Sequence, residues 1–421
     1  MNLIIPHAYN VPGRVEKVTC SLIKEFSKLI DKVIFVLPEN KIDYFKKIIP
    51  PSDKLIYETF SWPRGSWQNR VYLNLSKILA VMEKYGCAKS LLYKKLYEKK
   101  ERLKKDDIIK YLAKKHKATH CLYMIINAQR VPSLKIPVAG IVHDVFWLTF
   151  PDCYSEEFKK ERQENLIEWL TKADVVFAVS NRTKKDILSI YSKNQSKVQV
   201  IPEAADINKK NFSKTNKQKI PILYYPAGLN DHKHHLILFK AAYKLAQKKL
   251  KFKLLLTGKD TEYLTGNRPI KSMIEEQARI FYQKNKKLMS KYVKSLGYCD
   301  NEKVDALYKK CSAVVLASVY EGFGLPLAEA LARGIPVICS DIDVFEEQIE
   351  LYKCKDFVTT FPAGNVDALT GCCAEFLKHP KKRLSYEAVK RRFSHWTWKE
   401  VAEKYINCLR TCKPVFANQK A

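Results

Sequence analysis

Residues 312–341, SAVVLASVYEGFGLPLAEALARGIPVICSD, constrain the fold of this chain more than any other stretch. The apolar run 312–319 is rich in Val and Ala and is long enough for one buried strand. The helix expected over residues 325–333 has Pro326 in its first turn and a glycine just past its end, the usual order of start and stop residues. Residues 335–339 read as a second buried strand. The pattern predicts the strand, loop, helix, strand unit of parallel α/β proteins.

The loop of this unit, residues 320–324 (YEGFG), is the first candidate for a ligand site. Its two glycines let the backbone turn tightly and approach a ligand closely. The loop opens onto a helix N-terminus, where free N–H groups favour an anion such as a phosphate. Glu321 and Glu329 would repel a phosphate, so they make better sense as acceptors for hydroxyl groups. A nucleotide-sugar, with phosphate between two hydroxyl-rich rings, fits this layout.

The spacing Glu321-x7-Glu329 inside EGFGLPLAEALARGIPVICSD resembles the signature of a known family. This is the large retaining glycosyltransferase family numbered four, also called glycosyl transferases group 1, whose members have the GT-B fold. The resemblance implies an α/β protein with two Rossmann-like domains that face each other across a cleft. The alternative is a plain strand–helix–strand unit whose acidic side chains are solvated, but the two glycines, Pro326 and the trailing Gly-x-Pro favour the family.

The length of 421 residues favours two domains rather than one core. Residues 206–219 (DINKKNFSKTNKQK) are polar and nearly free of apolar side chains, which is typical of a linker. We therefore expect an N-terminal Rossmann-like domain over residues 1–205 and a second one over residues 220–390. By the resemblance, the first faces the acceptor, the second binds the nucleotide-sugar, and residues 391–421 form a helix that crosses back to the first domain.

The resemblance also implies which residues carry out catalysis. Lys233 matches the family lysine that holds the donor diphosphate, and Glu321 matches the acid that takes the transferred sugar. His143 follows the strand expected over residues 138–142, at the strand end where α/β folds place ligands, and it is expected to face the sugar. Many members have an arginine where this chain has Gly228, so the second cation is missing or comes from a histidine or another lysine.

Other residues are expected to bind the donor. The loop backbone would hold the diphosphate, Glu329 would take the ribose hydroxyls, and the segment 295–300 (SLGYCD) would lie beside the base. The donor-binding residues implied by the resemblance are Gly322, Phe323, Gly324, Leu325, Glu329 and Tyr298.

Two patterns suggest metal binding at first sight. His232, His234 and His235 lie close together in the sequence, but no carboxylate or cysteine clusters with them. Asp341-Ile342-Asp343 contains the Asp-x-Asp signature of a different glycosyltransferase fold, but it follows a strand, so one of the two acids is expected to cap the next helix. We expect no metal and no cofactor, only a GDP- or UDP-sugar as donor substrate.

The predicted function is metal-independent transfer of a hexose, of the mannose or glucose type, from a nucleotide-diphosphate sugar to a glycan or a lipid-linked acceptor. The family retains the anomeric configuration, and because no nucleophile is evident, departure and attack on the same face are the default hypothesis. The net charge of +31, from 75 basic and 44 acidic residues, prompts one alternative, a glycosyltransferase that acts on modified DNA. Gly228 and a first loop with one glycine prompt another, a non-catalytic nucleotide-sugar-binding module. The sequence does not identify the sugar, the base, the acceptor or the oligomeric state.

Cellular location is predicted from three observations. The chain shows no signal-peptide pattern and no apolar run of the ~18 residues that a membrane span needs. Its twelve cysteines are scattered without C-x-x-C pairs, which is typical of a reducing compartment. We expect a cytoplasmic protein that does not bind nucleic acid. The basic helix predicted over residues 93–105 and the Trp- and Arg-rich residues 61–70 suggest peripheral contact with an anionic membrane; a solvated helix and a packed loop are the alternatives.

Overall fold

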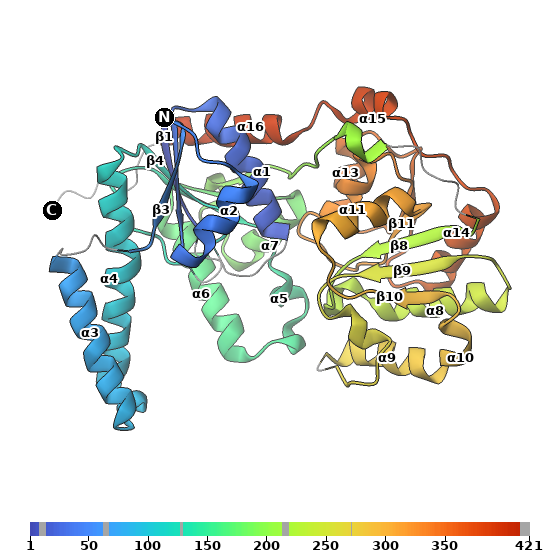
Figure 1. The fold of residues 1–421 in the computed structure, drawn as a ribbon, viewed down its shortest axis with the longest axis horizontal. Helices are drawn as coiled ribbons and strands as arrows, with labels where there is room; N and C mark the ends of the chain where they lie inside the picture. Colours follow the sequence, from blue (N-terminus) through green and yellow to red (C-terminus); the bar gives the residue numbers. More distant parts are fainter. Residues whose placement is uncertain (8–13, 62–66, 127–128, 213–218, 271, 413–421) are drawn as a thin grey trace.

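The computed structural model describes residues 1–7, 14–61, 67–126, 129–212, 219–270 and 272–412, with the backbone alone at residues 14, 67–70, 72, 89 and 98–107. Figure 1 shows two α/β lobes side by side, each built on its own sheet. Every ladder between the named strands is parallel. The predicted fold class, two Rossmann-like domains, is confirmed. The first loop of the chain falls largely on residues 8–13, outside the described part.

The N-terminal domain has a seven-stranded sheet in the order β3-β2-β1-β4-β5-β6-β7. Its strands are continuous apolar runs such as KVIFVL and VAGIV, because a parallel sheet is covered by helices on both faces. The strands are β1 (Asn2–Pro6), β2 (Lys32–Leu37), β3 (Leu55–Thr59), β4 (His120–Tyr123), β5 (Val138–Val142), β6 (Val175–Ala178) and β7 (Val198–Val200).

The helices of this domain cover both faces of the sheet, with one exception. The helices are α1 (Arg14–Leu29), α2 (Ile42–Ile48), α3 (Trp67–Lys84), α4 (Leu91–Lys115), α5 (Phe146–Thr149), α6 (Glu156–Lys172) and α7 (Asn181–Ile190). The exception is the hairpin of α3 and α4, which lies between β3 and β4 in the chain and projects away from the body of the domain (Figure 1). The C-terminal part of α4 anchors the hairpin, because Ile108, Ile109 and Leu112 are buried in the core.

The C-terminal domain has a six-stranded sheet in the order β10-β9-β8-β11-β12-β13. Its strands are β8 (Ile222–Pro226), β9 (Lys253–Thr257), β10 (Val293–Ser295), β11 (Ala313–Leu316), β12 (Val337–Ser340) and β13 (Val358–Phe361). Its helices are α8 (His235–Gln247), α9 (Met273–Lys284), α10 (Lys286–Met289), α11 (Asn301–Lys310), α12 (Leu325–Leu331), α13 (Asp343–Leu351) and α14 (Val366–Lys378). The predicted unit β11–α12–β12 is therefore confirmed.

The chain returns to the N-terminal domain at its end. The sequence predicted one helix over residues 391–421, but the described residues form two: α15 (Tyr386–Phe393) and α16 (Trp398–Thr411). A new helix begins because Thr397 and Glu400 form a capping box. α16 lies along α1 (Figure 1), with the Tyr405 ring 4.7 Å from that of Phe177.

The sheet of the N-terminal domain places β5 and β6 side by side, with Val142 opposite Ala178. Gly140 in β5 has no room for a side chain, because a Cβ atom there would lie 2.8 Å from the buried Trp169 ring. Both strands end at the edge of the sheet that faces the C-terminal domain, so His143 and Ser180 emerge together. Among the described residues, no helix is long and apolar enough to cross a membrane.

Candidate active site in the interdomain cleft

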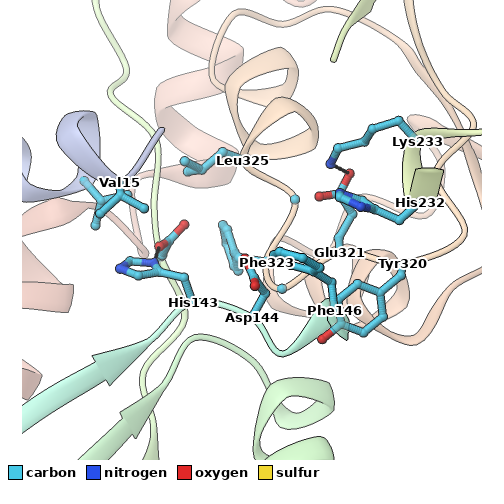
Figure 2. A pocket seen from close by; sticks show the side chains of 14 residues that line it. Val15, His143, Asp144, Phe146, His232, Lys233, Tyr320, Glu321, Phe323 and Leu325 are labelled. Carbon is cyan, nitrogen blue, oxygen red and sulfur yellow. Dashed lines mark hydrogen bonds and ion pairs between the residues drawn. The ribbon is translucent and has the colours of Figure 1, made fainter. Parts of the chain in front are cut away.

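A cleft of about 560 Å³, including its open mouth, lies where the two domains meet. Both domains contribute side chains to its wall (Figure 2). The N-terminal domain supplies Val15, Val18, His143, Asp144, Phe146 and Glu203, and the C-terminal domain supplies His232, Lys233, Tyr320, Glu321, Gly322, Phe323, Gly324 and Leu325. Of the residues predicted from the sequence, His143, Lys233, Glu321 and the loop 322–325 all line this cleft.

Lys233 and Glu321 form a buried ion pair at the C-terminal side of the cleft (Figure 2), with 2.6 Å between Nζ and Oε1. Lys233 ends the short 3-10 helix Asp231–Lys233, and its carbonyl accepts a hydrogen bond from Tyr225. The hydroxyl of Ser318 donates to the same Glu321 oxygen at 2.8 Å. Each charge is therefore oriented by a fixed neighbour, and burial strengthens their interaction because the surroundings are less polar than water.

The glycine loop touches the other domain at Gly322. A Cβ atom on this residue would lie 1.7 Å from the carbonyl oxygen of His143, so only glycine fits. The Gly322 carbonyl accepts hydrogen bonds from Ser180 at 2.6 Å and from Thr183 at 3.2 Å. Ser180 also caps α7 by accepting a hydrogen bond from the Thr183 N–H. The loop and the first turn of α7 therefore hold each other in place.

A second set of contacts closes the domains beside this loop. The carboxylate of Glu347 in α13 accepts from the backbone N–H groups of Asn181 at 2.7 Å and Arg182 at 2.9 Å, the first turn of α7. A carboxylate is stabilised there because these N–H groups have no partner within the helix. Tyr320 adds a further bridge, since its hydroxyl accepts from the Val145 N–H and donates to Asp186.

His143 lies in the cleft as predicted, but both of its ring nitrogens are already bonded. Nδ1 lies 2.9 Å from the Glu203 carboxylate and Nε2 lies 2.8 Å from the Met124 carbonyl. Burial alone would favour the neutral ring, yet the hydrogen bond and charge of Glu203, with the Met124 carbonyl, outweigh it and raise the pKa of His143. Two acceptors require two N–H donors, so the ring is held as an imidazolium. Glu203 is a site residue that sequence reasoning missed.

Asp144 is a second residue whose importance was not predicted. Its Oδ1 atom is buried and has no hydrogen-bond partner among the described residues. Burial, helped by the nearby Glu321, raises the pKa of Asp144 to about 6 against the opposing charges of His143 and Lys233. The unsatisfied oxygen is available to a ligand that donates a hydrogen bond.

Glu329 lies one turn along α12, just beyond the cleft wall. Its Oε2 accepts from the Tyr308 hydroxyl at 2.9 Å, and its Oε1 forms an ion pair with Lys17 of α1, across the domain boundary. Tyr298 follows β10 and is 66% exposed, so it does not line the cleft. Gly228 lies against the backbone of Lys259.

The histidines and aspartates that suggested metal binding in the sequence make other contacts in the structure. The ring of His232 stacks on Phe146 across the cleft, with 5.8 Å between centroids (Figure 2). His235 is fully buried and bonds to Glu275 at 2.8 Å. The prediction that an aspartate caps α13 is wrong: the N-cap is Ile342, and Asp341 accepts from the Ala363 N–H instead. Within the described ranges, no group of three or more His, Cys, Asp or Glu side chains is arranged to hold a metal ion.

Comparison with known proteins relates part of the chain to a described family. Residues 206–392 match the sequence model of the family described as glycosyl transferases group 1. The chain is 22% identical over 219 residues to O-antigen chain mannosyltransferase B of Escherichia coli, a match that covers 49% of this chain and 54% of that protein. It is 24% identical over 266 residues to O-antigen chain mannosyltransferase RfbU of Salmonella typhimurium, covering 61% and 67%. The matches thus span between about half and two thirds of these relatives.

Solved structures agree on the fold. The structure of Anabaena Alr3699/HepE in complex with UDP and glucose aligns over 98% of this chain and 100% of that one, with a TM-score of 0.63 and 16% identity. That of TarM aligns over 98% and 99%, with a TM-score of 0.64 and 14% identity. This likeness shows the GT-B fold. The family match concerns residues 206–392, the part of the chain that holds the C-terminal sheet.

Proposed function

We propose that the protein transfers a hexose, of the mannose or glucose type, from a nucleotide-diphosphate sugar to a glycan or a lipid-linked acceptor, with retention of configuration. The observation that carries this proposal is the buried Lys233–Glu321 pair, which faces His143 and Asp144 across the cleft. A lysine beside two acidic groups suits a ligand that combines phosphate with hydroxyl groups. The mannosyltransferases among the relatives and the UDP and glucose bound to HepE support the same substrate class.

The chemistry expected at this site is chiefly electrostatic. Negative charge builds up on the departing diphosphate while the sugar takes on oxocarbenium character. Lys233 and the backbone N–H groups of residues 322–325 stabilise that charge in our proposal, and no metal takes part. Glu321 accepts a hydroxyl of the transferred sugar and so fixes its orientation. Holding both reactants in one geometry lowers the entropic part of the barrier.

His143 acts, in our proposal, as a fixed positive charge and not as a proton carrier. Both of its N–H groups are engaged by Glu203 and Met124, so neither is available for proton transfer to the acceptor. Its charge lies on the same side of the cleft as the unsatisfied oxygen of Asp144, which we assign to a hydroxyl of the sugar. Glu329 remains the proposed acceptor for the ribose.

Peripheral membrane contact is proposed for the α3–α4 hairpin. Its tip exposes Tyr85 and Leu91, at 74% and 69%, beside the exposed lysines Lys84 and Lys94. Apolar tips with basic flanks suit the headgroup region of an anionic bilayer. The tryptophans and arginines on which the prediction for residues 61–70 rests lie outside the side chains that the structure describes. Sedimentation with phosphatidylglycerol vesicles should capture the protein, and Leu91→Asp should release it; equal binding of wild type and variant would contradict the assignment.

The donor site can be tested with a panel of nucleotides and nucleotide-sugars. A ligand present at 100 times its dissociation constant should stabilise the protein by about 2.7 kcal/mol, which a thermal shift detects easily. We expect a shift with one nucleoside diphosphate and its sugar, unchanged by a chelator.

Matched variants then test the residues. Lys233→Ala or Glu321→Ala should lower the transfer rate by ~100-fold or more, the effect of removing one preorganised partner. Lys244→Ala is the control, because Lys244 forms an exposed ion pair with Asp367 in the same domain. Wild-type rates in the Lys233 and Glu321 variants would show that the site is wrongly assigned. No shift with any nucleotide would argue against the enzyme itself.

A further inference from the structure

We propose that Lys17 delivers a second positive charge to the diphosphate of the donor, from the domain opposite Lys233. The inference rests on the proposed function, because it concerns how the same cleft receives its anionic ligand. It starts from an ion pair between α1 and α12 that joins the two domains at the rim of the cleft.

The charged side chains of the cleft wall do not by themselves balance the charge of the diphosphate. Among the described lining residues, Lys233 is paired with Glu321, and the His143 imidazolium is paired with Glu203. Asp144 remains as a further carboxyl group. These groups together give no excess of positive charge, whereas a nucleoside diphosphate carries at least two negative charges. The ligand therefore needs a cation that the wall does not provide.

Lys17 is placed to supply it. Its side chain is 42% exposed and its Nζ is bonded to Oε1 of Glu329. Glu329 lies four residues after Leu325, which lines the cleft, and one helical turn is about 5.4 Å long. A lysine side chain is flexible and carries three donors, so a shift of this size needs only a change of rotamer.

Donor binding would release the lysine. Both oxygens of Glu329 have partners: Tyr308 on Oε2 and Lys17 on Oε1. If the ribose hydroxyls take the place of Lys17 on Oε1, the ammonium group loses this partner and can turn to the diphosphate. Glu329 thus holds Lys17 in position until the ligand arrives. Because α1 belongs to the N-terminal domain, the new contact would replace the Lys17–Glu329 pair as a link between the two domains.

A simpler role for Lys17 predicts the opposite result. If the lysine merely occupies Glu329, it competes with the ribose, and its removal should tighten the binding of any nucleotide. If it contacts the diphosphate, its removal should weaken only ligands that carry phosphate. Comparing a nucleoside with its diphosphate separates the two roles.

The experiment is isothermal titration of wild type, Lys17→Gln and Lys17→Arg with GDP, UDP, guanosine and uridine. Lys28→Gln is the matched control, because Lys28 pairs with Glu25 on the same helix. We expect Lys17→Gln to bind the preferred diphosphate at least ~10-fold more weakly, the effect of one charged hydrogen bond, with nucleoside binding unchanged or tighter. Lys17→Arg should keep most of the affinity.

Two results would overturn the proposal, and only one of them would also refute the proposed function. If wild type binds a diphosphate and Lys17→Gln binds it equally or more tightly, the role of Lys17 is wrong while the proposed function stands. If wild type binds neither diphosphates nor nucleosides, both the role of Lys17 and the proposed function are refuted.

Discussion

The substitution Gly322→Ala tests whether the cleft must close as described. The new Cβ atom would lie 1.7 Å from the carbonyl oxygen of His143, whereas side chains rarely come within 3.0 Å of such an atom. The clash would be between the Cβ atom, which is fixed to the backbone of residue 322, and the backbone carbonyl of His143, so no change of side-chain rotamer can relieve it. The two domains must therefore separate locally by more than about 1 Å, and the hydrogen bonds from Ser180 and Thr183 to the Gly322 carbonyl are disturbed.

A displacement of about 1 Å can cost ~100-fold in rate when the reacting groups lie on opposite walls. We expect Gly322→Ala to lower kcat by that order, and to keep a folded C-terminal domain. The assay is transfer with saturating donor, together with small-angle scattering to detect a more open protein. Gly371→Ala in α14 is the control, since a Cβ atom there meets nothing within 4 Å.

The result that would refute the reasoning is simple to recognise. If Gly322→Ala transfers sugar at the wild-type rate, the loop does not press against β5 during catalysis. The closed contacts would then have no part in the reaction.

Three further predictions follow from the charged groups around the cleft. Glu203→Gln should lower the pKa of His143, so that the transfer rate falls above about pH 6.5, where wild type is flat; identical pH–rate profiles would contradict this. Burial, with the nearby His143 and Lys41, lowers the pKa of His7 to about 4, so the folded state holds the ring neutral. The unfolded chain therefore binds more protons than the folded protein between pH 6.5 and 4, and wild type should lose about 3 kcal/mol of stability over this window as pH falls. Denaturant unfolding of His7→Phe should not show this loss. Equal pH dependence of stability in wild type and His7→Phe would contradict the prediction. Glu347→Gln should weaken closure by about 1 kcal/mol, visible as a larger radius of gyration, and an unchanged radius would exclude a role for this contact.

The parts of the protein that the sequence predicted are those with a local signature. The unit from β11 to β12 follows from apolar runs, Pro326 and the glycines, and the same signature brought Glu321 and the loop to the cleft. Ser180 could be recognised as a helix cap because its partner lies three residues away. The roles assigned to these residues remain predictions.

The parts that it did not predict depend on distant residues. Lys17 meets Glu329 across 312 positions of sequence, and Glu203 meets His143 across 60. No local pattern reports such pairs. The break before α16 was different, because the capping box at Thr397 and Glu400 is visible in the sequence and was overlooked.

The central claim is that the cleft transfers a sugar from a nucleotide-sugar by means of Lys233 and Glu321. The most direct test is release of nucleoside diphosphate from GDP-mannose and UDP-glucose, with a glycan acceptor and a chelator present. The account predicts turnover of one donor by wild type and a loss of ~100-fold or more in Lys233→Gln. Absence of turnover with every donor, or equal rates in wild type and variant, would contradict it.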